Sequence, residues 1–265
     1  MVTRAARKLE GQVALVTGGG KGIGRAIALA LGARGVAVLV TGRGEKALGE
    51  AVGEIAHGGG KARHLPGDVR DPGHLRAAVE KAVASFGRLD IVVANAGLGG
   101  RVPLGEADVE GRARAILETN LLGTYQTFDA AVPSMPGPGR LLAVSSVLAK
   151  FGVPGFAAYC ASKAGILGLV RATAHELAPR GITCNAVVPG WVQTDMAEAG
   201  LDEIALGTGK PRDQVRREAE EAFPLGRFLE PEEVAELVVF LCSSAGDGIT
   251  GQAISICGGA TAFGG

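Results

Sequence analysis

The sequence predicts an α/β fold: a single domain with a doubly wound, seven-stranded parallel sheet and helices on both faces. Two observations predict it. Short β-branched runs alternate with longer helical patterns along the 265 residues, and the strand segments are almost entirely apolar. Strand–helix alternation at this spacing implies right-handed βαβ units, and strands buried on both faces carry such continuous apolar runs. Seven strands in one unbroken alternation fit one domain, residues 1–265, better than two.

The N-terminal half of the chain contains four predicted strands, each followed by a helix. Short apolar runs mark the strands at residues 13–17, 36–41, 62–65 and 89–94. Longer segments with a helical pattern mark helices at residues 23–34, 45–56 and 73–86, and a long helical stretch within residues 106–132. Each strand with its following helix is one half of a βαβ unit.

The C-terminal half continues the alternation with one interruption. Further strands are predicted at residues 141–144, 182–188 and 253–256, and helices at 157–178 and 232–242. Residues 190–230 are more polar, longer than an ordinary connection, and carry Gly200, Gly207 and Gly209. Because loops of that length are usually functional, we expect a substrate loop or lid at about 190–230. A solvated insertion is the alternative.

Composition excludes several function classes. Lys and Arg number 27 and Asp and Glu number 27, so the formal net charge of zero argues against capture by nucleic acid or an anionic membrane. No signal peptide is evident, and the apolar runs are too short to cross a bilayer. The four cysteines have no metal-site spacing. We therefore expect a cytoplasmic protein without a metal, nucleic-acid or membrane partner.

Glycine is the outlier, with 43 residues, and a cluster of glycines marks the first candidate site. Residues 17–24, TGGGKGIG, join the first strand to the first helix. Glycines there let the backbone approach a pyrophosphate, and the helix N-terminus supplies free N–H groups. The literal G-x-G-x-x-G pattern is absent, because Gly18, Gly22 and Gly24 are spaced i, i+4, i+6. The expected cofactor contacts in this loop are Gly18, Gly20, Lys21, Gly22, Ile23 and Gly24.

Charge near the second strand indicates which dinucleotide binds. A preference for NAD usually places an acid about 20 residues after the loop, on the ribose 2′-OH. Residues 40–44, VTGRG, contain no acid, and Arg43 is placed to accept a 2′-phosphate. Lys21 adds a second positive charge. The alternative is a surface Arg43 paired with Glu45 or Glu50, but the missing acid favours NADP(H).

A tyrosine and a lysine share one face of a predicted helix. Tyr159 and Lys163 are four residues apart. A free tyrosine has a pKa of about 10, and a nearby ammonium lowers it, which suits acid–base chemistry near neutral pH. Ser146 stands at the end of an apolar strand, whereas strand alternation turns Ser145 the other way. An ordinary amphipathic helix is the alternative for the Tyr–Lys pair alone.

The glycine spacing resembles the T-G-x-x-x-G-x-G loop of the short-chain dehydrogenase/reductase family, and the resemblance covers almost the whole chain. The matching motifs are the 17–24 loop, Gly67-Asp68-Val69, Asn95-Ala96-Gly97, Asn120, Ser146, the Y-x-x-x-K pair Tyr159 and Lys163, and the P-G segment at residues 189–194. Residues 223–235, residues 256–259 and the pair Gly99 and Gly100 are most similar to the β-ketoacyl and polyketide ketoreductase branch.

The resemblance implies a Rossmann fold and a role for each matched residue. Tyr159 would protonate the substrate carbonyl oxygen, Ser146 would polarise it, and Lys163 would lower the pKa of Tyr159 and hold the nicotinamide ribose. Asn120 would position a water that relays protons. The implied cofactor contacts beyond the glycine loop are Arg43, Asp68, Val69, Asn95, Ala96, Gly97, Tyr159, Lys163, Pro189, Gly190, Val192 and Thr194.

We therefore expect an NADPH-dependent reductase of ketones or acyl thioesters. The residues expected around the substrate are Leu98, Val147, Phe156 and Trp191, although Trp191 is alternatively a hydrophobic anchor for residues 190–230. A hydroxyacyl-CoA or secondary-alcohol dehydrogenase of the same family fits nearly as well, and a non-catalytic NADP-binding regulatory protein is the rival from another class. The family also implies a homotetramer or homodimer formed through the helices at 107–132 and 157–178.

Overall fold

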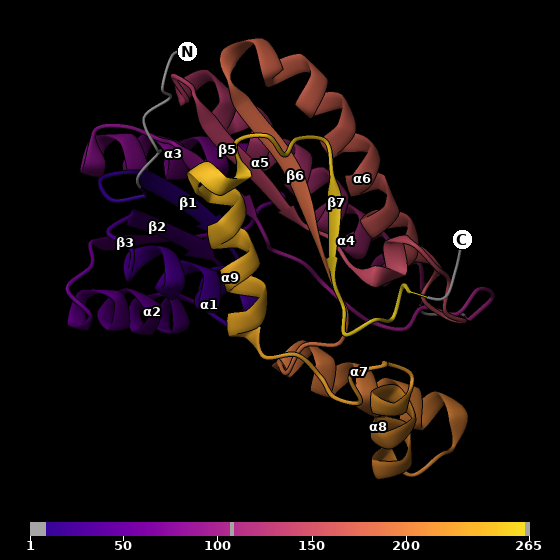
Figure 1. The fold of residues 1–265 in the computed structure, drawn as a ribbon. Helices are drawn as coiled ribbons and strands as arrows, with labels where there is room; N and C mark the ends of the chain where they lie inside the picture. Colours follow the sequence, from indigo (N-terminus) through magenta and orange to yellow (C-terminus); the bar gives the residue numbers. More distant parts are fainter. Residues whose placement is uncertain (1–8, 107–108, 263–265) are drawn as a thin grey trace.

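The computed structural model describes residues 9–106 and 109–262, and in these ranges seven strands form one parallel sheet (Figure 1). The sheet order is β3-β2-β1-β4-β5-β6-β7. The strands are β1 (Val13–Thr17), β2 (Ala37–Gly42), β3 (Ala62–Pro66), β4 (Ile91–Ala94), β5 (Gly139–Val144), β6 (Ile182–Pro189) and β7 (Ala253–Ile256). The predicted fold class is confirmed. The strand order reverses between β1 and β4, and in such sheets ligands bind at the carboxyl ends of the strands beside that reversal.

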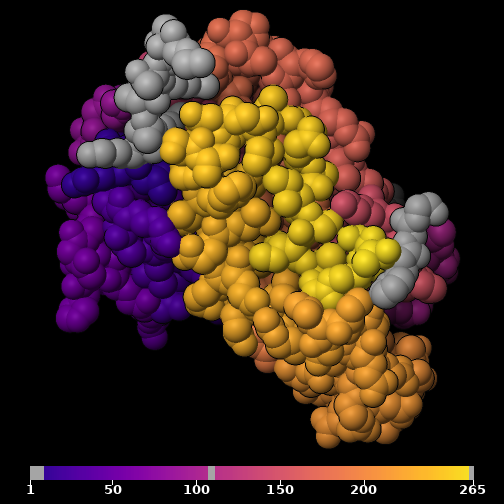
Figure 2. Space-filling view, in the orientation of Figure 1, coloured from indigo at the N-terminus to yellow at the C-terminus, as the bar shows by residue number. Residues whose placement is uncertain are grey.

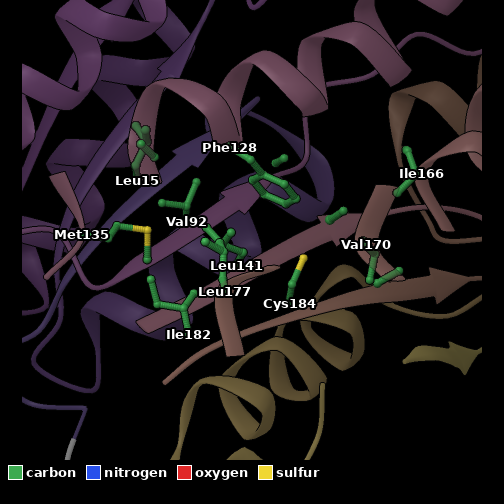
Figure 3. Close-up of a cluster of buried hydrophobic side chains, with 14 of the residues drawn as sticks. Leu15, Val92, Phe128, Met135, Leu141, Ile166, Val170, Leu177, Ile182 and Cys184 are labelled. Carbon is green, nitrogen blue, oxygen red and sulfur yellow. The ribbon is translucent and has the colours of Figure 1, made fainter. Parts of the chain in front are cut away.

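Helices cover both faces of the sheet. One face carries α1 (Gly22–Gly32), α2 (Glu45–His57) and α9 (Pro231–Cys242), and the other carries α3 (Pro72–Phe86), α4 (Val109–Leu117), α5 (Gly123–Ala131) and α6 (Ala157–Leu177). Alternate residues of β1 enter the two cores: Val13 and Leu15 pack on the α3, α5 and α6 side, and Ala14 and Val16 on the other. Figure 3 shows the first of these cores. The all-apolar strands are thus explained by burial on both faces.

The predicted helical stretch within 106–132 is interrupted by a turn of π-helix. Residues 107 and 108 lie outside the described part of the chain; after them, α4 continues into a π-helical turn at Glu118–Leu122 and then into α5. Turns of this kind occur frequently at functional sites. Here the turn carries Asn120, whose side chain leaves the helix to bind the backbone of Leu98.

Residues 190–230 are not a loop, and here the sequence-based expectation was wrong. They form a hairpin of α7 (Asp195–Thr208) and α8 (Arg212–Glu221). The Thr194 hydroxyl accepts a hydrogen bond from the Ala197 N–H and starts α7, and Gly209, with φ of 70°, ends it. The α7–α8 hairpin projects below the carboxyl ends of β6 and β7 (Figures 1 and 2). It can therefore cover a ligand bound there, as a lid would.

The hairpin has a small hydrophobic core of its own. Buried Leu201, Val215 and Phe228 lie at its centre, with Trp191 packed against them. The rings of Trp191 and Phe228 stack at 5.2 Å between centroids, with 5° between their planes. Among the described residues, no helix is long and apolar enough to cross a membrane.

Candidate active site

The glycine loop lies at the carboxyl end of β1 and is tightly bound to the turn after β4. Gly18 and Gly22 have φ of 65° and 49°, a region that suits glycine. A Cβ on Gly24 would lie 2.2 Å from the Gly18 carbonyl oxygen and 2.3 Å from Asn95 Nδ2. The Asn95 amide donates to the carbonyls of Thr17 at 3.0 Å and Gly18 at 3.3 Å. No larger residue fits at Gly24 without moving this turn.

This loop has the properties that a pyrophosphate requires. The side chain of Lys21, the N-cap of α1, makes no capping hydrogen bond, and the first turn of α1 contains no acid. The N-terminus of α1 therefore offers backbone N–H groups and a positive dipole end at the loop. Gly20 instead packs on α2, where an added Cβ would lie 3.2 Å from the backbone of Ala47. Ile23 packs partly against the core on the α1 side.

The charges at the ends of β2 and β3 lie close together. The Asp68 carboxylate accepts hydrogen bonds from the Arg70 guanidinium at 2.7, 3.1 and 3.2 Å. This contact lowers the pKa of Asp68, with a smaller contribution from Arg43. Within the described part of the chain, Arg43 makes no ion pair with Glu45 or Glu50; Glu50 lies 4.0 Å from Lys46 instead. The guanidinium of Arg43 thus stays available at the end of β2.

Lys21 is engaged rather than free. Its ammonium pairs with Asp195 at 3.1 Å, and both side chains are largely exposed. Asp195 is the first residue of α7, and a Cβ on Gly22 would lie 3.1 Å from the Thr194 side chain. The start of the hairpin therefore rests directly on the glycine loop.

The serine, tyrosine and lysine meet at the end of β5. The hydroxyl of Ser145 donates to the Lys163 carbonyl at 2.9 Å and so points into the interior. Ser146, in contrast, lies beside the Tyr159 side chain, whose pKa it lowers, and its hydroxyl accepts the Leu148 N–H at 3.2 Å. Lys163 is buried, and its ammonium lies 5.7 Å from the centroid of the Tyr159 ring. The structure places Ser146, not Ser145, beside the tyrosine.

Burial shifts the pKa values of Tyr159 and Lys163. It raises the pKa of Tyr159, because the phenolate would lose its hydration, and the neighbouring Ser146 offsets part of that rise. Burial also lowers the pKa of Lys163 to about 8, and the ammonium donates to the Val144 carbonyl at 2.8 Å. The expected lowering of the Tyr159 pKa is therefore not found: the shift has the opposite direction, and desolvation is its largest cause.

Asn120 is fully buried, and its side chain holds the backbone of one residue. Its Oδ1 accepts the Leu98 N–H at 2.7 Å, and its Nδ2 donates to the Leu98 carbonyl at 2.9 Å and to Ser162 Oγ at 3.0 Å. A Cβ on Gly97 would lie 3.3 Å from Asn120 Oδ1 and 3.5 Å from Lys163 Nζ. Asn120 thus fixes the turn after β4 next to the lysine.

Two positioning residues were missed by sequence reasoning. The Thr17 hydroxyl accepts the N–H groups of Asn95 and Ala96, at 3.0 and 3.1 Å. Ser162 passes a hydrogen bond from Asn120 to the Tyr159 carbonyl at 2.8 Å. The position of Thr17 as the first residue of the glycine motif was the only sequence signal for either.

The expected substrate residues do not all face an open site. Val147 is buried in the core with 3% exposure, and Phe156 is 8% exposed directly before α6. Leu98 is half-buried beside Asn120. Trp191 packs into the hairpin core, which supports its alternative role as the anchor of residues 190–230.

The P-G segment after β6 joins this strand to β7 and to the hairpin. Pro189 ends β6, and the Gly190 N–H donates to the Ile256 carbonyl at 3.0 Å. A Cβ on Gly190 would lie 3.1 Å from Cys257 Cα. Val192 forms an isolated bridge with Leu229. The segment is therefore fixed on both sides where it passes the carboxyl edge of the sheet.

A doubly wound sheet with a glycine cradle on one side of its carboxyl edge and a Ser–Tyr–Lys set on the other defines a dinucleotide-dependent oxidoreductase. Residues 18–261 match the family model described as enoyl-(acyl carrier protein) reductase. The chain belongs to the short-chain dehydrogenase/reductase family.

Similar proteins cover nearly the whole chain. The 3-oxoacyl-[acyl-carrier-protein] reductase FabG of Thermotoga maritima is 37% identical over 257 residues, which are 95% of this chain and 98% of that protein. The short-chain reductase protein NovJ of Streptomyces niveus is 40% identical, covering 93% of each chain. The crystal structure of an actinorhodin polyketide ketoreductase variant with NADPH matches with a TM-score of 0.91 and 34% identity, over 97% of this chain and 100% of that one. These similarities support a ketone reductase within the family.

Proposed function

We propose that this protein is an NADPH-dependent ketoreductase that reduces a β-ketoacyl or polyketide-type carbonyl to a secondary alcohol. One observation carries the proposal: the Tyr159 side chain lies beside Ser146, which lowers its pKa, and beside Lys163, at the edge of the sheet that carries the glycine cradle. The raised pKa of Tyr159 keeps its hydroxyl protonated at neutral pH. A protonated tyrosine is the form that a reduction uses as its acid.

The residues present fit the proposed cofactor. The loop glycines and the N-terminus of α1 would hold the pyrophosphate, Arg43 the 2′-phosphate and Lys163 a ribose hydroxyl. The Asp68–Val69 segment lies at the end of β3, where the adenine would lie. When bound, NADPH supplies the hydride that reduces the carbonyl carbon. The actinorhodin ketoreductase structure contains NADPH, which supports the same preference here.

Side chains of this protein would polarise and protonate the carbonyl oxygen of the substrate. Ser146 would donate a hydrogen bond to the substrate oxygen, and Tyr159 would transfer its proton there as negative charge develops. The ammonium of Lys163, at 5.7 Å from the ring, would stabilise the phenolate left behind. One proton from solvent then restores Tyr159. Asn120 acts in this scheme through Leu98, by holding the turn beside Lys163.

The raised pKa of Tyr159 favours reduction of a ketone over the reverse reaction, oxidation of an alcohol. A hydroxyacyl-CoA or secondary-alcohol dehydrogenase uses the tyrosine as a phenolate base, and burial disfavours the phenolate. Oxidation would therefore need alkaline pH. The proposed physiological direction is reduction.

Assembly into a homotetramer or homodimer is also proposed. Leu122 is 49% exposed and Tyr125 is 53% exposed, on the π-turn and the start of α5. Large apolar side chains grouped on a surface often mark a contact with another chain. Light scattering at several concentrations tests this, and a monomer throughout would contradict it. The cytoplasmic location stays a prediction from sequence.

A substrate panel tests the proposed reaction. The purified protein is mixed with NADPH or NADH and with simple ketones, β-ketoesters, or β-ketoacyl thioesters on CoA or on acyl carrier protein, and loss of cofactor absorbance is followed. We expect turnover with NADPH, fastest with a β-ketoacyl substrate. Tight NADPH binding without turnover of any substrate would favour the non-catalytic regulatory protein. A parallel assay with secondary alcohols and NADP+ or NAD+ follows the gain of cofactor absorbance. Turnover there, with none of the ketones reduced, would favour the dehydrogenase.

A further inference from the structure

Residues 97–101 run from the catalytic lysine to the α7–α8 hairpin. At one end, an added Cβ on Gly97 would lie 3.5 Å from Lys163 Nζ, and Leu98 is held through both backbone groups by Asn120. At the other end, the Arg101 N–H donates to Glu203 Oε2 on α7 at 2.6 Å. We call residues 97–101 the wall segment. Whatever fixes it also fixes one side of the space next to Tyr159 and Lys163.

Glu203 holds the wall segment with both of its oxygens. While Oε2 accepts the Arg101 N–H, Oε1 pairs with the guanidinium of Arg112 on α4. The Glu203 side chain is 28% exposed and that of Arg112 is 48% exposed, which is similar to the exposure of the ion pairs inside the hairpin. Three parts of the chain, α4, α7 and the wall segment, therefore meet at one carboxylate.

Two close contacts support the same arrangement independently of Glu203. A Cβ on Gly99 would lie 3.2 Å from Met196 Cγ, so the start of α7 packs on the middle of the wall segment. The Arg101 guanidinium lies between Gly207 and Gly155, where added Cβ atoms would come within 3.0 and 2.8 Å of it. The absence of side chains at these glycines lets α7 lie directly along the wall segment.

We propose that Glu203 is a positioning residue that clamps the wall segment under α7 and so determines how tightly the ketone substrate is held. The proposal rests on the proposed reductase function. The clamp acts on the space around the substrate, while Tyr159 and Lys163 are held by α6 and by the hydrogen bonds of Lys163 to the end of β5. Its loss should therefore weaken substrate binding and leave the chemical step and the cofactor site nearly unchanged.

Four variants of the full chain test the clamp: Glu203→Ala, Glu203→Gln, Arg112→Leu, and Glu203→Ala combined with Arg112→Leu. Asp202→Asn is the matched control, because Asp202 neighbours Glu203 but pairs with Arg212 inside the hairpin. The measurements are KM and kcat for the best ketone, the Kd for NADPH, and amide hydrogen exchange of the peptide that contains Arg101.

Glu203→Ala should raise KM roughly tenfold, because it removes a charged acceptor from two donors. The values of kcat and of the Kd for NADPH should stay within about twofold of the wild-type values. Exchange at Arg101 should accelerate by a similar factor. Glu203→Gln keeps an acceptor for the Arg101 N–H and should give an intermediate change. In the Arg112→Leu background, Glu203→Ala should raise KM by a smaller factor, because Glu203 has already lost one of its partners.

The proposal is overturned if Glu203→Ala changes neither KM nor amide exchange more than Asp202→Asn does. It is equally overturned if the loss appears in kcat or NADPH binding with KM unchanged. Should the wild-type protein reduce no ketone, the proposed function fails, yet amide exchange at Arg101 still decides whether Glu203 clamps the wall segment.

Discussion

The catalytic edge of the sheet and the α7–α8 hairpin are held together by different forces. At the catalytic edge, Asn120 and Lys163 are buried, and both bond backbone carbonyls. In the hairpin, Glu198 pairs with Arg212 and Arg216, and these side chains are 29–41% exposed. Breaking a buried hydrogen bond leaves an unsatisfied group, whereas exposed ion pairs contribute little and are screened by salt. We therefore expect a rigid catalytic edge and an adjustable covering formed by the hairpin.

Tyr159→Phe should produce the largest change, since it removes the acid and nothing else. We expect kcat/KM to fall about 1000-fold, within the range that general acid catalysis contributes. The Kd for NADPH should change less than about threefold, because the glycine loop and Arg43 are untouched. Steady-state kinetics and a fluorescence titration of NADPH measure the two effects.

Tyr125→Phe is the matched control for that experiment. Tyr125 is the chain's other tyrosine and is 53% exposed on α5, so its loss should leave kcat/KM unchanged. A Tyr159→Phe enzyme that keeps its full activity would rule out the proposed mechanism.

Lys163→Met should separate activity from stability at the same edge. Activity should fall about 100-fold, because no cation then stabilises the phenolate. Stability should rise at pH 7, since burial lowers the pKa of Lys163 from 10.5 to about 8, a cost of about 3 kcal/mol to the folded state. The lost hydrogen bond to Val144 offsets about 1 kcal/mol of that gain. Urea unfolding measures the net change.

The pH dependence of the unfolding free energy gives a second, independent measure of how far Lys163 is desolvated. Between about pH 8 and 10.5 the unfolded chain binds a proton at Lys163 that the folded chain does not, so wild-type stability from this residue rises with pH in that window. Lys163→Met should remove this rise, and the exposed Lys61→Met should retain it. Equal pH slopes for the wild type and Lys163→Met would show that the lysine is not desolvated.

The catalytic edge was the more predictable of the two regions. Strand β1 and its neighbours follow from apolar runs buried on both faces. The candidate pair Tyr159 and Lys163 follows from its i, i+4 spacing, and Asn120 from the family resemblance. The hairpin was missed because Gly200 and Gly207 lie inside α7 and weaken its helical pattern, and α8 buries only Val215 of its own residues.

Long-range contacts explain the remaining differences. The π-turn depends on hydrogen bonds between Asn120 and Leu98, and the clamp joins Arg101 to Glu203, 102 residues further along the chain. The pKa of Tyr159 depends on how much solvent the folded chain excludes. The spacing of a motif predicts neither the π-turn, nor the Arg101–Glu203 contact, nor the pKa of Tyr159. Each depends on which distant segments of the chain pack together.

Arg43→Asp should give the next largest effect, on the choice of cofactor. The substitution removes a guanidinium suited to a 2′-phosphate and adds a carboxylate that repels it and accepts a ribose 2′-OH. We expect the ratio of kcat/KM for NADPH to that for NADH to fall roughly 30-fold or more, since charged hydrogen bonds of this kind are among the strong ones.

Arg63→Asp is the control for that change in charge. Arg63 lies on the edge strand β3 and donates to its neighbour's carbonyl, so the same substitution there changes the net charge without touching the end of β2. If both variants shift the cofactor ratio equally, or Arg43→Asp leaves it unchanged, Arg43 does not read the 2′-phosphate.

Asp195→Asn should have the smallest effect, and it tests the contact that joins the two regions. Asp195 starts α7 and pairs with Lys21 of the glycine loop, with side-chain exposures of 84% and 74%. A pair so exposed contributes little, so KM for the ketone should change less than about twofold.

The same substitution also frees the Lys21 ammonium for an anion. The affinity for NADPH should therefore rise slightly, by less than about threefold, while the affinity for NADH stays constant. Because bulk salt screens exposed charges, this difference should vanish near 1 M NaCl. Asp213→Asn, in the first turn of α8, should change neither affinity. A tenfold loss of ketone binding in Asp195→Asn would mean that the hairpin is fixed to the glycine loop as firmly as Asn120 is fixed to Leu98, and the contrast between a rigid edge and an adjustable covering would then be wrong.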